Sequence, residues 1–260
     1  MSDALHVWGL QVPLVWEDSE ANIAAVDAWM ARRPAAVEVI ALPEMWSTGF
    51  TMRPEAVAEP AEGGAAFAAM RRWADETGAL VCGSLSVRDG GVFRNRHYAV
   101  EPGGAFTAYD KRHAFTFGGE HLHYAPGTDQ VVVNWRGWRL LLLMCYDLRF
   151  PVFARNRARD AYDGILVVAN WPAVRSEAWA VLLRARAIEN QAHVLGVNRL
   201  GEDGNGVEHT GRSAWIDPQG RGRERTEPGW FGGAWDRKEL AAFRAKFPVL
   251  GDADDFSLVR

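Results

Sequence analysis

Short runs of apolar residues, separated by turn-forming residues, recur along the whole chain. Runs of about four to eight apolar or alternating residues predict strands, whereas apolar positions about three or four apart predict helices. Strands are therefore expected at residues 5–12, 37–42, 80–87, 92–101, 106–109, 131–135, 138–144, 165–169 and 194–198. Helices are expected at residues 19–30, 65–77, 151–161, 177–191 and 238–247.

Residues of known capping and turn preference set the expected boundaries of these elements. Ser19 is the expected N-cap of the first helix, and Gly78 closes the second. Pro151 suits the first turn of the third helix. The tripeptide Asp89-Gly90-Gly91 predicts a hairpin between the strands that flank it.

The order of the expected elements indicates an α/β chain. Strands and helices alternate through both halves, and the inserted hairpins give too many strands for one simple doubly wound sheet. Two packed β-sheets with helices outside them are therefore predicted. No repeat or linker-like stretch interrupts the 260 residues, so we expect a single domain over residues 1–260.

Composition narrows the class of protein. Hydrophobic residues make up 48% of the chain and include 12 Trp and 12 Phe, which argues for a packed core and against disorder. A net charge of -4, with both signs dispersed, provides no electrostatic footprint for nucleic acid or an anionic membrane. The longest apolar run, residues 140–146, is far shorter than the roughly 18 residues of a membrane helix.

The cysteine count and the first residues bear on location. Two cysteines are too few for a disulfide framework or a cysteine-rich structural zinc site. The opening sequence MSDALHVWGL lacks a basic region followed by an apolar core, as a secretory signal would have. A cytoplasmic location is therefore expected.

Three apolar strands run directly into a reactive side chain. Glu44 follows the strand at 37–42, Lys111 follows 106–109, and Cys145 follows 138–144. Ligands bind at the carboxyl ends of strands in α/β folds, so the three side chains could converge on one pocket. Lys111 is also one of only three lysines among 29 basic residues.

The residue types favour thiol chemistry. Cys145 is the candidate nucleophile, and a following helix N-terminus with a nearby lysine is expected to lower its pKa. Glu44 could act as general base, and Lys111 could stabilise an oxyanion. The alternative is a buried inert cysteine, as expected for Cys82, with the carboxylate and ammonium solvated on loops.

The polar, aromatic stretch 110–129 is long enough for a functional loop. Glu120 within it could orient Lys111 or assist proton transfer, or could be solvated. His121 and His123 have the residue type of metal ligands, which leaves a metal-dependent hydrolase as a weaker alternative. A protease-type pair of Cys145 with a histidine is another alternative, with His113, His193 or His209 as the candidate, but no local motif supports it. The simpler expectation is that these histidines are hydrogen-bonded structural residues.

Taken together, these segments resemble the nitrilase superfamily of carbon-nitrogen hydrolases. The resemblance extends from the first strand to about Trp235 and rests on three ordered motifs, Leu42-Pro43-Glu44, Tyr109-Asp110-Lys111-Arg112-His113 and Cys145-Tyr146-Asp147-Leu148-Arg149-Phe150-Pro151. It implies an αββα sandwich and a Glu44–Lys111–Cys145 triad with Glu120 as second glutamate. It also implies an oxyanion hole completed by the Tyr146 backbone N–H, and no cofactor or metal.

A finer resemblance points to a subgroup. The motifs that carry it are Asn170-Trp171-Pro172-Ala173, residues 184–191 and residues 145–152, which look like those of bacterial omega-amidases acting on 2-oxoglutaramate and 2-oxosuccinamate. Such substrates carry a carboxylate, for which Arg149 and Arg175 are the candidate ligands. Each arginine could instead form a structural ion pair, and Trp171 could wall the pocket or belong to the core.

Several alternatives stay open at this point. Another amidase of the superfamily, such as a deaminated-glutathione amidase or an N-carbamoyl hydrolase, is the nearest one. A nitrilase and a catalytically silent binding module are more distant. Because the family usually pairs subunits through helices near the cysteine strand, a homodimer or higher homo-oligomer is expected, and the tail from about residue 237 is a candidate part of the interface.

Overall fold

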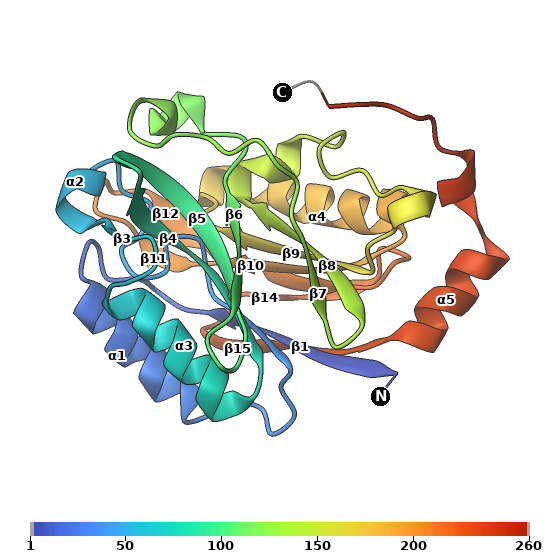
Figure 1. The fold of residues 1–260 in the computed structure, drawn as a ribbon, viewed down its shortest axis with the longest axis horizontal. Coiled ribbons are helices and arrows are strands. Elements are labelled where there is room, and N and C mark those ends of the chain that lie inside the picture. The colour runs from blue at the N-terminus through green and yellow to red at the C-terminus, as the bar shows by residue number, and fades with distance from the viewer. Residues whose placement is uncertain (1–2, 259–260) are drawn as a thin grey trace.

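The computed structural model describes residues 3–258 and contains two large β-sheets (Figure 1). The first sheet has the strand order β15 (Gly229–Asp236), β1 (Ala4–Gln11), β2 (Val39–Ala41), β4 (Leu80–Asp89), β5 (Val92–Val100) and β6 (Phe106–Asp110), with β3 (Glu59–Pro60) paired to β4. The second has the order β14 (Gly222–Arg225), β13 (Ser213–Ile216), β10 (His193–Asn198), β9 (Gly164–Ala169), β8 (Trp138–Met144) and β7 (Val132–Trp135). A small hairpin joins β11 (Leu200–Glu202) and β12 (Glu208–Thr210).

Helices cover the outer face of each sheet. Within residues 3–258 the α-helices are α1 (Ser19–Met30), α2 (Pro54–Val57), α3 (Ala65–Thr77), α4 (Ser176–Asn190) and α5 (Arg237–Lys246). Helices α1 and α3 pack with the first sheet in one apolar cluster, which includes Val26, Met70 and Trp73. Helix α4 packs on the second sheet. The predicted αββα sandwich is confirmed.

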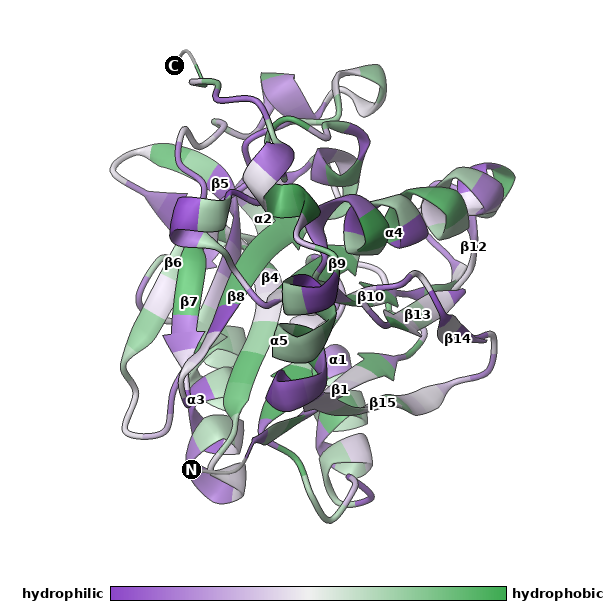
Figure 2. Cartoon of the chain, turned by 90° about the vertical axis from the view of Figure 1, so that its right-hand side faces the viewer, coloured by the Kyte–Doolittle hydropathy of each residue, from purple (hydrophilic) through white to green (hydrophobic). Residues whose placement is uncertain are grey.

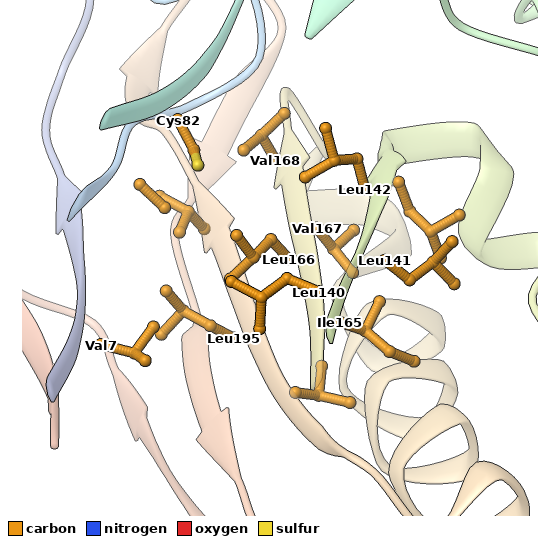
Figure 3. Packing of buried hydrophobic residues seen from close by; sticks show 14 of the residues in the cluster. Val7, Cys82, Leu140, Leu141, Leu142, Ile165, Leu166, Val167, Val168 and Leu195 are labelled. Carbon is orange, nitrogen blue, oxygen red and sulfur yellow. The ribbon is translucent and has the colours of Figure 1, made fainter. Parts of the chain in front are cut away.

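The main core lies between the two sheets. Alternate residues of β8, β9 and β10 point to the first sheet, and Leu140, Leu166 and Leu195 lie toward Val7 and Cys82 (Figure 3). Leu141, Ile165 and Val167 lie on the opposite side of these strands (Figure 3), and β8 and β9 also contact the 3-10 helix at Cys145–Arg149. In the hydropathy view, the hydrophobic colour follows these buried strands, while α4 shows both colours (Figure 2). Strands buried on both faces are the reason for the continuous apolar runs in the sequence.

The parallel strands bring their carboxyl ends together. Strands β8, β9 and β10 are mutually parallel, as are β1, β2 and β4. Residues that follow β2, β8 and β9 therefore emerge at one edge of the sandwich, as the pattern predicted. No helix in the part of the chain that the structure describes is long and apolar enough to span a bilayer.

Two local predictions were wrong. No helix spans residues 151–161; turns follow a 3-10 helix at Cys145–Arg149, and a second short 3-10 helix spans Ala158–Asp160. The cause is Asn156, whose side chain bonds the backbone of Tyr162 and Asn190 and so competes with helical hydrogen bonds. At α1 the N-cap is Asp18, whose carboxylate accepts from the Ala21 N–H, because the helix begins at Ser19 itself.

Candidate active site

The four predicted catalytic residues meet at the carboxyl edge of the sheets. Lys111 Nζ lies 2.7 Å from Glu44 Oε1 and 2.9 Å from Glu120 Oε2. The side chains of all three are almost completely buried, and Cys145 is half-buried at the end of β8. Segments far apart in the sequence thus place two carboxylates, one ammonium and one thiol together.

Electrostatics fix the charge of the lysine. Burial alone would lower the pKa of Lys111, but Glu120 and Glu44 outweigh it and raise that pKa above its ordinary value. The pKa of Glu120 is raised, chiefly by burial and also by Glu44, while Lys111 opposes the shift. Lys111 is therefore a permanent cation that binds both carboxylates.

Cys145 stands on a sharp turn between β8 and the 3-10 helix at Cys145–Arg149. Its φ of 39° lies in the left-handed region, which only a few per cent of non-glycine residues adopt. Asp147 holds this turn, because its Oδ2 accepts from the Met144 N–H at 3.0 Å and from the Tyr109 hydroxyl at 2.7 Å. Its Oδ1 accepts from the His113 N–H at 3.1 Å. The strained turn presents the thiol at the strand end.

The predicted lowering of the thiol pKa was wrong. Burial raises the pKa of Cys145 well above its ordinary value, and Glu44 raises it further, while Lys111 only partly opposes them. The expected helix N-terminus is missing, since a 3-10 turn follows the cysteine. The resting nucleophile is accordingly a neutral thiol, which needs a base to remove its proton.

Sequence reasoning gave no role to two asparagines at this site. Asn95, on β5, donates to Glu44 Oε1 at 2.8 Å and to Glu120 Oε1 at 3.1 Å. Asn170 follows β9; its backbone N–H donates to Glu44 Oε2 at 2.9 Å, and its carbonyl lies 3.8 Å from Cys145 Sγ. The position of Asn170 directly after an apolar strand is the same signal that singled out Glu44 and Cys145, and could have identified it.

A pocket of about 540 Å³ opens onto Cys145. The predicted substrate-binding residues all line it: Tyr146, Arg149, Trp171 and Arg175. The Arg149 guanidinium carbon lies 4.9 Å from the ring centroid of Trp171, and that of Arg175 lies 5.4 Å from Phe115. Neither guanidinium has an ion pair or hydrogen bond with any residue between 3 and 258. Two unneutralised cations therefore face the space in front of the thiol.

Comparison with known proteins decides the family. A sequence model described as "Carbon-nitrogen hydrolase" matches residues 9–229, which is most of the chain. The chain belongs to the carbon-nitrogen hydrolase family. The predicted resemblance is thereby confirmed, and the protein is an amide-hydrolysing enzyme.

Relatives of this carbon-nitrogen hydrolase match it over nearly their full length. It is 45% identical to the omega-amidase YafV of Escherichia coli (strain K12) over 98% of both chains. Its identity to the 2-oxoglutaramate amidase of Bacillus subtilis (strain 168) is 30%, covering 94% of this chain and 95% of that one. A superfamily protein of Xanthomonas campestris with an arsenic adduct in its active site superposes over 100% of both chains with a TM-score of 0.95 and 39% identity.

The alternative sites considered from the sequence, a metal site and a cysteine–histidine pair, are not formed by the described residues of this carbon-nitrogen hydrolase. His121 is exposed and His123 half-buried, and no group of three potential ligands among residues 3–258 could hold a metal ion. His113 binds Asp147 and stacks on Phe150. Cys82 is buried with a raised pKa, as expected of an inert thiol.

The two remaining histidines also lie in structural positions. His209 Nδ1 is 3.3 Å from the Gly201 carbonyl. His193 stacks on Trp235, and its ring nitrogens have no hydrogen-bond partner among the described residues, which corrects the expectation that it is hydrogen-bonded. The ring is packed against aromatic side chains instead.

Proposed function

We propose that this enzyme is an omega-amidase that hydrolyses omega-amides of 2-oxo dicarboxylates, such as 2-oxoglutaramate and 2-oxosuccinamate, to the acid and ammonia. The observation that carries the proposal is the pocket, where two unpaired guanidiniums face a thiol beside a buried Glu–Lys–Glu cluster. The names of the relatives that match nearly the whole chain support the same substrate class.

In the first half of the reaction, Glu44 accepts the proton of the Cys145 thiol as sulfur attacks the amide carbon. The carbonyl oxygen becomes an oxyanion, which the Lys111 ammonium and the Tyr146 backbone N–H stabilise. The tetrahedral intermediate then collapses, the C–N bond breaks, and nitrogen leaves as ammonia with the proton from Glu44. The product of this half is a thioester on Cys145.

In the second half, Glu44 accepts a proton from water as the water oxygen attacks the thioester carbon. Collapse of the second tetrahedral intermediate breaks the C–S bond, releases the carboxylic acid, and returns the proton to the sulfur. Glu120 keeps Lys111 in place throughout, because it accepts two hydrogen bonds from the ammonium. The chemistry uses side chains, one backbone N–H and water, so the mechanism requires no cofactor.

Selectivity for the substrate comes from the pocket wall. Arg149 and Arg175 bind the carboxylate at the far end of the substrate, since guanidinium groups match carboxylates in geometry and charge. Trp171 is 3% exposed and supports Arg149 from below. The aromatic rings of Tyr146 and Phe115 limit the width of the pocket.

A substrate panel tests the proposal. Ammonia release is measured for 2-oxoglutaramate, 2-oxosuccinamate, an N-carbamoyl amino acid and an aliphatic nitrile, and release of the dipeptide amine is measured for deaminated glutathione. The expected result is a kcat/KM for the two 2-oxo acid amides at least about 100-fold above the others, because the nitrile lacks the charged anchor and the other two compounds differ in the group that must fit beside the thiol. A clear preference for deaminated glutathione or the carbamoyl compound would reassign the substrate. Hydrolysis of none of them would favour a silent binding module.

The proposal includes a cytoplasmic homodimer or higher homo-oligomer. Both cysteines are free thiols, as expected of a protein in a reducing compartment. Helix α4 exposes Val181 and Ile188, a surface that a second subunit could cover, and the tail from about residue 237 hydrogen-bonds to Gln191 at the end of this helix. Light scattering on the wild type and on Val181→Glu tests the assembly. A monomeric wild type would contradict it.

A further inference from the structure

Asn95 contacts three of the four residues at the site. Its side chain is 1% exposed in the middle of β5, and its amide nitrogen reaches Glu44 Oε1 at 2.8 Å and Glu120 Oε1 at 3.1 Å. Its backbone carbonyl accepts the N–H of Lys111 at 3.0 Å. One strand residue thus touches both carboxylates and fixes the backbone of the lysine between them.

A neighbouring hydroxyl sets the direction of the Asn95 amide. Ser84 Oγ donates to Asn95 Oδ1 at 2.8 Å. The same oxygen accepts the N–H of Met45, the residue after Glu44, also at 2.8 Å. Because the backbone N–H can only donate, the hydroxyl proton is directed to Asn95. The amide oxygen is then occupied, and the two N–H groups face the carboxylates.

The charges at the site explain why such a donor matters. Two buried carboxylates share one ammonium, and like charges this close favour protonation of one of them. The other titratable groups facing them, Cys145 and Tyr124, stay neutral, since burial raises the pKa of each. Lys111 alone therefore leaves one negative charge uncompensated by a cation.

We propose that Asn95 is a positioning residue that keeps Glu44 and Glu120 both ionised around Lys111, so that Glu44 is free to accept the thiol proton. The inference rests on the proposed function of Glu44 as base. An amide that offers only N–H groups stabilises the charged form of each carboxylate and holds the two at a fixed separation. The effect is transmitted through Glu44 and Glu120, not by contact with substrate.

Two variants of Asn95 and one control test the proposal. Asn95→Ala removes the donor, and Asn95→Asp keeps the volume but adds a third carboxylate. Asn156→Ala is the matched control, because Asn156 is equally buried and hydrogen-bonded but bonds Tyr162 and Asn190 instead of catalytic residues. The readouts are the pH profile of kcat/KM and the pH dependence of the rate at which iodoacetamide alkylates Cys145.

Asn95→Ala is expected to move the acid limb of both profiles to higher pH, because the buried carboxylates lose a hydrogen bond that stabilises their charged forms. Asn95→Asp moves it at least as far. In both, kcat falls by about 100-fold while KM stays within about threefold. Asn156→Ala lowers stability and leaves both profiles in place. An acid limb of Asn95→Ala that coincides with that of the wild type would overturn the proposal.

Ser84→Ala provides a second test of the proposal if an Asn95 variant does not fold. It leaves the amide in place but removes its orienting hydroxyl, so a smaller upward shift of the acid limb is expected, and an unchanged limb counts against the proposal. Alkylation requires no substrate. A shifted alkylation profile in an enzyme that fails to hydrolyse 2-oxoglutaramate would uphold the role of Asn95 while rejecting the substrate.

Discussion

Asn170 connects directly to Glu44 across the two sheets of the sandwich. Glu44 follows β2 of the first sheet, and Asn170 follows β9 of the second. The backbone N–H of Asn170 donates to Glu44 Oε2, and its side-chain amide donates to the Glu44 carbonyl. The separation of base and thiol is therefore fixed by the packing of one sheet on the other.

Asn170→Ala tests this connection. The variant loses the side-chain bond to the Glu44 carbonyl, which should lower the free energy of unfolding by about 1–3 kcal/mol and kcat by about tenfold or more. Urea unfolding and steady-state kinetics measure the two effects. Asn22→Ala, which removes a buried asparagine bonded to Val15 and Ser47, should lower stability alone. Equal kcat in wild type and Asn170→Ala would contradict the connection.

Glu44→Gln should lower kcat strongly while leaving the thiol in place. The glutamine cannot accept the proton of a thiol whose pKa is raised by burial, so kcat should fall by about 10²–10⁴-fold. Alkylation of Cys145 at neutral pH should slow as well, because the loss of the base outweighs the loss of the Glu44 charge that raises the thiol pKa. Mass spectrometry of the labelled peptide follows the second effect, with buried Cys82 as internal reference. Alkylation as fast as in wild type would show that another group accepts the proton.

Arg149→Met and Arg175→Met should weaken the binding of acidic amides. Loss of one charge-assisted contact should raise KM for 2-oxoglutaramate about 10–100-fold, because a hydrogen bond to a charged group contributes about 1.5–3 kcal/mol. Hydrolysis of a small uncharged amide should change little. Arg32→Met is the matched control, since Arg32 also lies over an aromatic ring, Trp29, but does not line the pocket. A KM unchanged in both pocket variants would place the carboxylate elsewhere.

Buried neutral histidines should make the fold sensitive to acid. Burial lowers the pKa of His97 and of His193 to about 3. Between about pH 6.5 and pH 3, only the unfolded chain binds the two protons, so the free energy of unfolding falls as pH falls through this window. At pH 5 each histidine should contribute a loss of about 2 kcal/mol.

His193→Phe measures that contribution. The phenyl ring can keep the stack on Trp235, whose centroid lies 5.1 Å from that of His193. Urea unfolding at pH 7 and pH 5 should show a loss smaller by about 2 kcal/mol than in the wild type. His121→Phe, at an exposed position, should keep the wild-type dependence on pH. A loss in His193→Phe as large as in the wild type would contradict the account.

The placement of Glu44, Lys111 and Cys145 could be predicted because each follows a strand whose apolar run is visible in the sequence. The contacts of Asn95 and Asp147 could not, since they depend on pairing between distant strands and on the turn at Cys145. The prediction of a helix at 151–161 was wrong because the Asn156 side chain forms hydrogen bonds that replace those of a helix. The spacing of apolar residues carries no information about such side-chain bonds. The direction of the shift in the Cys145 pKa depends on burial and on the proximity of Glu44, and both are set by the tertiary structure.

Ammonia release from 2-oxoglutaramate by the wild type and by Cys145→Ala, assayed in parallel, is the most direct test of the central claim. The account predicts release by the wild type and none above background by Cys145→Ala. No release by either protein, with Cys145 still open to alkylation, would retain the nucleophile and reject the substrate. Release by both proteins would contradict the thioester mechanism itself.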